Sequence, residues 1–490
     1  MASSLDVKRL ALGLSCVLLT AVLAWFGAGL FPLWPLMWFA PLPALVFALC
    51  SRTWWGAALV AAIGWCSGNL NVAGFYLGIG ASPILLVLIA GPVTVAFTLA
   101  VLLFRAFARR DRVWSALLAF PSCWVALEFV NSLLSVHGTF GSLAYTQLNF
   151  LPFLQLASLT GPWGMSFLLL LFPAAAALGL HLHRDSRREA WCIMGVSVGV
   201  IAAVLVFGAV RLALPTPGQP VKVGLVASDP PTSPEVAGPG APSMKLMAQY
   251  AAQVQALVAK GAQVIVLPEK LAVIVDSDTR ALDLQYQSLA DLAQVSVVVG
   301  LIHEVPPLKY NEARVYTPRA PVQTYNKEHL LPPFESNLTP GRSLLTLRGP
   351  SGIWGVAICK DMDFRRPAQD YGNARAGLLL VPAWDFNGDR LAHGHMAVMR
   401  GVEDGFGIVR AAKQGFLTVS DNRGRILAET TSYSHPFTTL TAKVPAVHVW
   451  TLYQTLGDWF GWVNLGLLAL ILASLWPGVP SRAGVASATP

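Results

Sequence analysis

Long apolar runs without charge dominate the first 213 residues of the chain. From Leu10 to Ser51, and again from Thr53 to Phe104, there is no Asp, Glu, Lys or Arg. A helix needs about 20 apolar residues to cross the hydrocarbon core of a bilayer, so each run is long enough for two spans. Eight transmembrane helices are predicted, at 10–30, 33–50, 54–76, 82–104, 113–134, 163–182, 190–212 and 459–477.

The segment 135–162 lies between two of these spans and has a different character. It is apolar but rich in Gly, Pro and Asn, which do not favour a continuous helix. Irregular backbone at membrane depth must be buried against protein, because lipid offers it no hydrogen bonds. A re-entrant or interfacial segment is therefore expected within a seven-span membrane domain covering residues 1–213.

Basic residues gather in alternate loops and indicate how the chain crosses the membrane. Ten of them lie on the side of the N-terminus: Lys8, Arg9, Arg52, Arg105, Arg109, Arg110, Arg112, Arg184, Arg187 and Arg188. Loops rich in Lys and Arg stay in the cytoplasm, so both termini are expected there, with residues 221–450 on the far side of a bacterial inner membrane. The net charge of +8 thus reflects orientation, and no nucleic-acid partner is expected.

Residues 221–450 carry most of the acidic side chains and are predicted to form a water-soluble domain. A linker at 214–220 precedes them, an eighth helix at 451–478 follows, and 479–490 form a cytoplasmic tail. Apolar runs at 221–228, 262–269, 295–302, 313–316, 322–327, 353–361, 377–383 and 417–420 are predicted strands. A helix at 243–260, capped by Ser243, lies between the first two, and a hairpin turn is expected at 422–424. This alternation predicts a layered α/β fold; the loop 229–242 is expected to be flexible, with a lid as the alternative.

Three of the predicted strands end in residues that suit nucleophilic catalysis. Glu269, Lys327 and Cys359 follow apolar runs, and strand ends in α/β sheets project into a common crevice. A thiol nucleophile needs a base for its proton and positive charge nearby, which a carboxylate and an ammonium supply. Cys359 is the single cysteine of residues 221–450, so no disulfide framework is expected.

The motifs around these residues resemble the nitrilase, or carbon–nitrogen hydrolase, superfamily. They are LPEK at 267–270, YNKEHLLPPFE at 325–335 and ICKD at 358–361. With eight spans around such a domain, the chain is similar to the apolipoprotein N-acyltransferase family. Further landmarks of that family are WVALE at 124–128, YTQ at 145–147, GPWG at 161–164 and LGDW at 456–459.

The resemblance implies an α-β-β-α sandwich, a function and a set of roles. Cys359 would attack a phospholipid ester and form a thioester, and the N-terminal amine of a diacylglyceryl-cysteine lipoprotein would then accept the acyl chain. Glu269 would act as general base, Lys327 as oxyanion donor with the backbone N–H of Lys360, and Glu335 as a supporting carboxylate. No cofactor and no metal is implied, and a monomer is expected.

Several positions depart from the family pattern or need support of their own. Lys360 and Asp361 stand where an aromatic residue and Glu are usual, and Trp384 keeps its place without the usual Phe-Gly after it. Glu128 and Gln147 are candidate polar residues of the membrane domain. Two alternatives stay open: a membrane-anchored amidase or nitrilase, and a non-catalytic scaffold for a lipid-linked glycosyltransferase.

Five more polar residues are expected to be structural. His393 and His395 lack a third ligand for a metal. Arg400, Glu403 and Arg410 are predicted on one helix, with Arg400 and Glu403 spaced for an ion pair.

Overall fold

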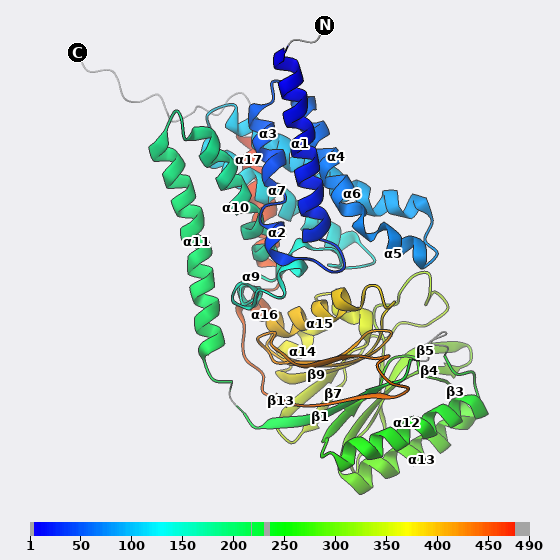
Figure 1. Cartoon of the computed structure of the whole chain (residues 1–490). Coiled ribbons are helices and arrows are strands. Elements are labelled where there is room, and N and C mark those ends of the chain that lie inside the picture. Colours follow the sequence, from blue (N-terminus) through cyan, green and yellow to red (C-terminus); the bar gives the residue numbers. More distant parts are fainter. Residues whose placement is uncertain (1–3, 217, 230–235, 476–490) are drawn as a thin grey trace.

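A layer of helices lies above a layered α/β part in the protein (Figure 1). The computed structural model describes residues 4–216, 218–229 and 236–475. The long helices are α1 (Ser4–Gly27), α4 (Trp54–Asn69), α6 (Pro83–Ala108), α7 (Val113–Leu134), α10 (Pro162–Leu182) and α11 (Arg187–Ala213). Shorter ones are α2 (Trp34–Met37), α3 (Leu42–Cys50), η1 (Leu70–Val72), α5 (Ala73–Gly78) and α17 (Trp459–Ala473).

In the described part of the chain, six helical segments are long and apolar enough to cross a membrane, which makes this a multi-pass membrane protein. They cover 7–27, 54–78, 83–108, 113–134, 162–182 and 187–213. The other two predicted spans are shorter than expected. The span at 33–50 is divided into α2 and α3 near Pro41. Helix α17 has 15 residues and ends at Ala473, and residues 476–477 of the predicted span 459–477 lie outside the described residues.

Short helices lie between α7 and α10, in the segment 135–162. They are η2 (Leu143–Gln147), α8 (Leu151–Leu154) and α9 (Ala157–Thr160), and most of their residues are buried. Gly161 ends the segment with φ of +61°. A Cβ there would lie 2.3 Å from the ring of Tyr453, so only glycine fits this turn.

Two sheets stack face to face in the α/β part. The first has the order β13-β1-β2-β4-β5-β6, with β3 beside β4; the second has the order β12-β11-β10-β9-β8-β7. The strands of the first are β1 (Pro220–Ala227), β2 (Val264–Val266), β3 (Val273–Val275), β4 (Ser296–Val305), β5 (Leu308–Tyr316), β6 (Gln323–Asn326) and β13 (Thr438–Pro445). Those of the second are β7 (Thr346–Gly349), β8 (Gly352–Val356), β9 (Ala376–Trp384), β10 (Gly407–Lys413), β11 (Phe416–Ser420) and β12 (Ile426–Thr431).

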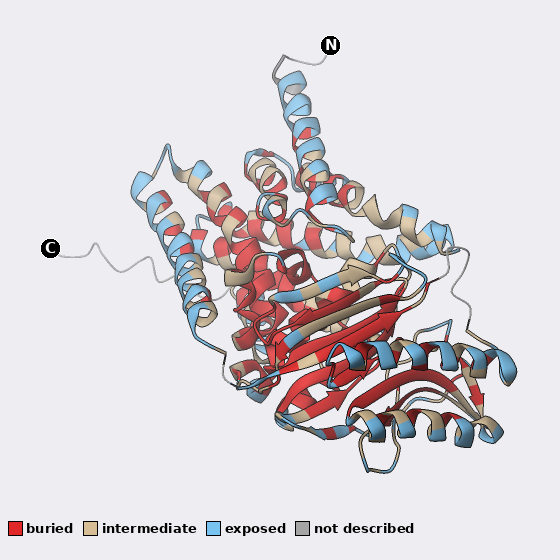
Figure 2. Ribbon diagram, turned by 60° about the horizontal axis from the view of Figure 1, so that its bottom comes forward, coloured by how far each residue is buried: buried red, intermediate tan, exposed pale blue. Residues whose placement is uncertain are grey.

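Helices cover both outer faces of the stacked sheets, which confirms the predicted α-β-β-α sandwich. On the first sheet lie α12 (Ala241–Ala259) and α13 (Asp276–Ala293), whose outward faces are exposed (Figure 2). On the second lie α14 (Ala368–Asn373) and α15 (Arg390–Asp404), between the sheet and the transmembrane helices (Figure 1). Apolar side chains fill the space between the sheets and the space under each helix layer.

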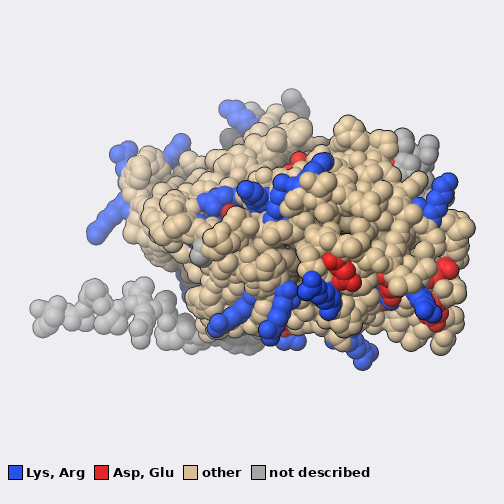
Figure 3. Space-filling model, turned by 90° about the horizontal axis from the view of Figure 1, so that it is seen from below, with Lys and Arg blue, Asp and Glu red and all other residues tan. Residues whose placement is uncertain are grey.

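The outer end of the α/β part carries scattered charge. Figure 3 shows Lys and Arg side chains separated by uncharged surface, with Asp and Glu among them. This end is a solvated surface, in contrast to the exposed apolar residues of α1, α6 and α11.

Several local predictions were wrong in informative ways. Helix α12 begins at Ala241 after Gly240, so Ser243 is not its cap. The Ser243 hydroxyl is buried instead and contacts the carbonyls of Ala237, Gly238 and Val273. Arg410 lies on β10 and not on a helix. The run 353–361 leaves its strand after Val356. The hairpin turn at 422–424 is confirmed, between β11 and β12.

Other predicted segments fall partly outside the described residues. These are the linker residue 217, residues 230–235 of the loop 229–242, and the tail 479–490.

Candidate active site

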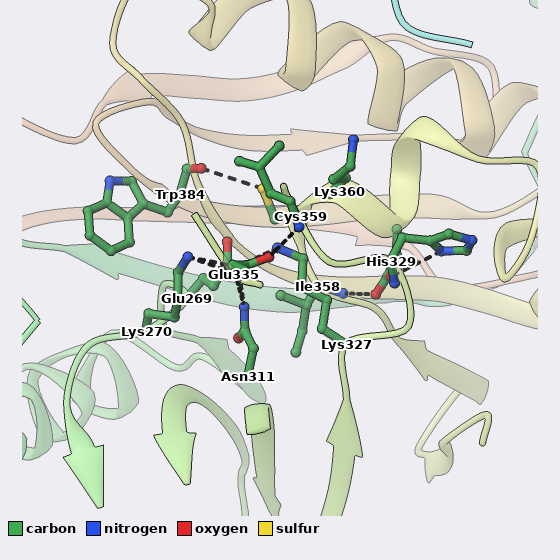
Figure 4. A network of polar contacts seen from close by, with 12 residues as sticks. Glu269, Lys270, Asn311, Lys327, His329, Glu335, Ile358, Cys359, Lys360 and Trp384 are labelled. Atoms are coloured by element: carbon green, nitrogen blue, oxygen red, sulfur yellow. Dashed lines mark hydrogen bonds and ion pairs between the residues drawn. The ribbon is translucent and has the colours of Figure 1, made fainter. Parts of the chain in front are cut away.

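The carboxyl ends of parallel strands from both sheets bring Glu269, Lys327 and Cys359 into one neighbourhood (Figure 4). Glu269 comes three residues after β2, Lys327 directly after β6, and Cys359 three residues after β8. This is the placement that the strand-end pattern predicts. Glu269 and Lys327 are almost fully buried, at 1% and 2% exposure.

Cys359 occupies a sharp turn between β8 and the short helix η3 (Cys359–Asp363). Its φ is +44°, a backbone conformation that non-glycine residues rarely adopt and that is common at functional sites. The thiol donates to the carbonyl oxygen of Trp384 at 3.5 Å. Trp384, at the end of β9, thereby orients the sulfur toward the strand ends.

The ammonium of Lys327 joins two carboxylates. It lies 2.8 Å from Glu269 Oε1 and 2.9 Å from Glu335 Oε2. Lys270 contacts the other oxygen of Glu335 at 2.7 Å. Asn311 from β5 donates to Glu269 Oε1 at 2.6 Å and to Glu335 Oε1 at 2.8 Å (Figure 4). Two carboxylates and two ammoniums therefore balance in charge, and one amide links both carboxylates.

Burial and these neighbours set the protonation of the reacting groups. Burial raises the pKa of the Cys359 thiol, and the negative charge of Glu269 raises it further, against the opposing effect of Lys327. Burial would lower the pKa of Lys327, but Glu269 and Glu335 raise it well above its usual range. Burial would likewise raise the pKa of Glu335, but Lys327 and Lys270 lower it. The site thus holds a neutral thiol beside a fixed ion-pair network, and the nucleophile needs a base when it reacts.

Asp361 supports the turn from within the α/β part. It is fully buried, and its Oδ2 accepts from the backbone N–H of Ile358 at 2.9 Å and from the hydroxyl of Tyr325 at 2.8 Å. Its Oδ1 accepts from the backbone N–H of His329 at 2.9 Å. Asp361 therefore ties the turn before Cys359 to the chain that follows Lys327.

Lys360 points away from Cys359 and toward the membrane domain. Its ammonium lies 3.1 Å from His137 Nδ1 and 3.5 Å from Asp363 Oδ2, and the residue is 3% exposed. The backbone of Asp363 also accepts from the N–H and the hydroxyl of Thr139, both at 2.9 Å. The Lys360 side chain thus helps to hold η3 against segment 135–162.

The two polar candidates of the membrane domain hold that same segment in place. Glu128 accepts from the backbone N–H of Leu143 at 2.9 Å. Gln147 accepts from the indole of Trp38 at 2.8 Å and donates to the carbonyl of Trp34 at 3.0 Å. The structure does not bring either residue to Cys359; their hydrogen bonds stay within the membrane domain.

The remaining polar candidates form ion pairs. Arg400 Nη1 lies 2.6 Å from Glu403 Oε2, as predicted, whereas Arg410 pairs with Asp385. His393 contacts Asp363 at 3.4 Å and Asp389 at 3.2 Å. Among the described residues no group of three or more His, Cys, Asp or Glu could hold a metal ion.

Sequence reasoning missed Asn311 and Lys270 as members of the site. Lys270 directly follows Glu269 and has φ of +49°, a turn that sends its side chain back toward Glu335. Asn311 is the first residue of the buried part of β5, which extends to Tyr316, and the polar and apolar pattern of the strand does not mark this position as interior.

Comparison with known families matches both parts of the chain. The family described as apolipoprotein N-acyltransferase N-terminal domain matches residues 20–175, and the carbon-nitrogen hydrolase family matches residues 234–445. Apolipoprotein N-acyltransferase of Geobacter metallireducens is 28% identical over 396 residues, which are 74% of this chain and 75% of that protein. Its namesake in Haemophilus ducreyi is 25% identical over 391 residues, 73% of this chain and 75% of that protein.

Two solved structures are each similar to about half of this chain. An amidase from Nesterenkonia sp. is 18% identical with a TM-score of 0.39 and covers 47% of this chain and 92% of its own. A carbon-nitrogen hydrolase from Helicobacter pylori is 16% identical with a TM-score of 0.38 and covers 51% of this chain and 94% of its own. The two family matches lie on the membrane part and on the α/β part of this chain, and the chain belongs to the apolipoprotein N-acyltransferase family.

Proposed function

We propose that this protein transfers a fatty acyl chain from a phospholipid, through a thioester on Cys359, to the N-terminal amine of a diacylglyceryl-cysteine lipoprotein. The observation that carries the proposal is the position of the cysteine turn. Helix η3 begins at Cys359 and is hydrogen-bonded at Asp363 to Thr139 of the membrane domain. A nucleophile held this close to a segment between two apolar helices of membrane-spanning length suits substrates that reside in a bilayer.

In the first half-reaction the Cys359 thiol attacks the ester carbonyl of the donor. Glu269 takes the thiol proton as the S–C bond forms, and the oxyanion is stabilised by Lys327 and the backbone N–H of Lys360. The acyl C–O bond then breaks, and Glu269 returns the proton to the departing lysophospholipid. Because Lys327 and Asn311 both contact Oε1 of Glu269, we assign the proton transfer to its Oε2.

In the second half-reaction the free amine of the lipoprotein attacks the thioester carbonyl. A new C–N bond forms and the C–S bond breaks. Glu269 takes the proton that the amine loses and passes it to the departing sulfur of Cys359, which restores the resting thiol. Glu335 and Asn311 do not react; they keep Lys327 and Glu269 in place. Trp384 holds the sulfur through its carbonyl oxygen, and Asp361 holds the turn.

We further propose a seven-span domain at 1–213, a catalytic domain at 221–450 and an eighth helix from 451. The excess of Lys and Arg in alternate loops supports a cytoplasmic N-terminus and a periplasmic catalytic domain in a bacterial inner membrane. The acceptor lipoprotein would meet the enzyme on that outer face.

The test is the intact mass of the full-length protein after incubation with vesicles of one defined phospholipid. We expect a single fatty-acyl adduct that neutral hydroxylamine removes, because hydroxylamine cleaves thioesters. Cys359→Ala should give no adduct, and Cys192→Ala, at an exposed position on α11, is the matched control that should retain it. Adding a diacylglyceryl-cysteine peptide should then remove the adduct and yield the N-acylated peptide.

The outcome separates the proposal from its alternatives. No adduct with any phospholipid, together with hydrolysis of small amides, would assign the site to an amidase. An adduct that water discharges as fast as the peptide does would make the protein a lipid hydrolase and overturn the transferase assignment.

A further inference from the structure

Lys413 is a buried cation that the mechanism above does not use. It ends β10 and lies in register with Trp384 on β9, and it is 3% exposed. Its ammonium lies 4.0 Å from the centroid of the Trp384 ring. Within the part of the chain that the structure describes, this ammonium has no hydrogen-bond or ion-pair partner.

The other cations of this neighbourhood are all neutralised. Lys270, 5.0 Å from the same ring, pairs with Glu335 at 2.7 Å. Lys327 contacts two carboxylates, and Arg410 pairs with Asp385. Burying an ammonium without a counterion is costly, so an uncompensated one beside a catalytic site calls for a ligand of opposite charge.

Asp229, the carboxylate with the largest electrostatic effect on Lys413, makes its hydrogen bonds to other groups. Oδ2 of Asp229 accepts from the backbone N–H of Gln414 at 2.6 Å and from the hydroxyl of Ser432. Its Oδ1 has no partner among the described residues. Burial lowers the pKa of Lys413 to about 8; Asp229 and Glu269 attract its proton and Lys270 repels it. The ammonium is thus charged near neutral pH and not fully compensated.

This charge lies on the ring of Trp384, a residue that also contacts the reacting thiol. Trp384 links the two, because its ring faces Lys413 and its carbonyl oxygen accepts from Cys359 at 3.5 Å. A glycerophospholipid whose ester reaches Cys359 carries its phosphate only a few bonds from that ester. The phosphate is the one permanent anion of such a donor, and a lysine is a common ligand for it.

We propose that Lys413 and the face of Trp384 form a subsite for the phosphate of the acyl donor, which makes the enzyme select a glycerophospholipid over a neutral lipid with the same ester. The inference rests on the proposed function and adds to it the group that recognises the donor. Free phosphate shares the chemistry that this subsite recognises and would compete for it.

The experiment compares two donors with identical acyl chains, phosphatidylglycerol and diacylglycerol, each in neutral detergent micelles with the full-length protein. The readout is the rate of Cys359 adduct formation with phosphatidylglycerol divided by the rate with diacylglycerol. We expect the ratio to fall about tenfold in Lys413→Gln, the size of one lost charge-assisted hydrogen bond, and to be largely kept in Lys413→Arg. Lys443→Gln, at an exposed position on β13, is the matched control.

Two further arms test the source of the anion and its charge dependence. Inorganic phosphate should slow acylation by phosphatidylglycerol in the wild type and not in Lys413→Gln. The donor ratio should also fall as the pH rises through about 8, because the ammonium then loses its charge. Asp229, Lys270 and Glu269 face the same group, and taking the ratio cancels their effect on the chemistry common to both donors.

An unchanged donor ratio in Lys413→Gln would overturn the subsite, even if both rates fall, because that pattern reports a structural role. Inhibition by phosphate that persists in the variant would also overturn it. If neither donor acylates Cys359 in the wild type, the proposed function fails instead, so the two failures are distinguishable.

Discussion

Asn311 is the residue whose replacement tests the site most sharply, because it performs no chemistry itself. It is fully buried, and its amide donates to Glu269 at 2.6 Å and to Glu335 at 2.8 Å. Asn311→Leu keeps the approximate volume and removes both hydrogen bonds. The base would lose one of the two groups that fix its Oε1, while Lys327 still holds it.

The magnitude follows from the bond to Glu269. A hydrogen bond to a charged group contributes about 1.5–3 kcal/mol, and about 1.4 kcal/mol corresponds to a factor of ten in rate. Asn311→Leu should therefore slow Cys359 adduct formation about 10- to 150-fold. Asn311→Asp should slow adduct formation more than Asn311→Leu does near neutral pH, because it places a third carboxylate beside those of Glu269 and Glu335. The rate of this variant should recover in part under mildly acidic conditions, where the introduced carboxyl carries a proton.

The assay is single-turnover adduct formation followed by intact mass, with thermal unfolding in detergent as the check on folding. Asn373→Leu, at an exposed position at the end of α14, is the matched control and should leave the rate unchanged. A folded Asn311→Leu variant whose rate stays within about twofold of the wild type would refute the argument that the amide positions the base.

Three further predictions concern stability, each read as the midpoint of thermal unfolding of the purified protein. Lys360→Met removes the contacts of the ammonium to His137 and Asp363, which stabilise the fold by about 1–3 kcal/mol. The variant should have a lower unfolding midpoint, and it should slow adduct formation less than Asn311→Leu does. An unchanged midpoint would contradict the structural role. Against the opposing effect of burial, the neighbouring ammoniums of Lys327 and Lys270 lower the pKa of Glu335 from 4.5 to about 2. Its contribution of ~3 kcal/mol to the free energy of unfolding is therefore present above about pH 4.5 and is lost as the pH falls toward 2. Glu335→Gln should flatten the acid side of the curve of midpoint against pH, and a curve of the same shape as the wild type would refute this. Gly208→Leu should destabilise the contact of α11 with α8, because a Cβ at Gly208 would lie 1.8 Å from the carbonyl oxygen of Pro152. Gly199→Leu on the same helix meets open space and should be tolerated. Equal midpoints for the two variants would count against this packing.

The sequence predicts those residues of the site that lie at the ends of strands. An apolar run that stops at a polar residue gives both a strand and the residue at its carboxyl end, and Glu269, Lys327 and Cys359 all follow from that pattern. The same pattern cannot reveal Asn311, because alternating polar and apolar residues on β5 are typical of a half-exposed strand. Only the stacked sheet makes the Asn311 face an interior one.

Backbone turns account for two features that the sequence pattern does not predict, the direction of the Lys360 side chain and the division of the span at 33–50. Lys360 follows a residue with φ of +44°, and the turn at Cys359 directs the next side chain toward His137 and away from the thiol. The span at 33–50 is divided because α2 ends at Met37 and a new helix, α3, begins at Leu42 directly after Pro41. Both outcomes depend on dihedral angles that periodicity does not encode.

The cysteine turn is held from two sides, and the two supports come from different parts of the chain. Asp361 binds the backbone before Cys359 from within the α/β part, whereas Thr139 and Lys360 bind the end of η3 to the membrane domain. Arg400 completes the second support by donating to the hydroxyls of Thr139 at 3.0 Å and Tyr145 at 2.6 Å. The membrane domain therefore does more than anchor the enzyme, because segment 137–145 forms part of the scaffold that fixes the nucleophile. An α/β part separated from these helices would keep Glu269, Lys327 and Cys359 but lose one of the two supports of the turn that carries the thiol.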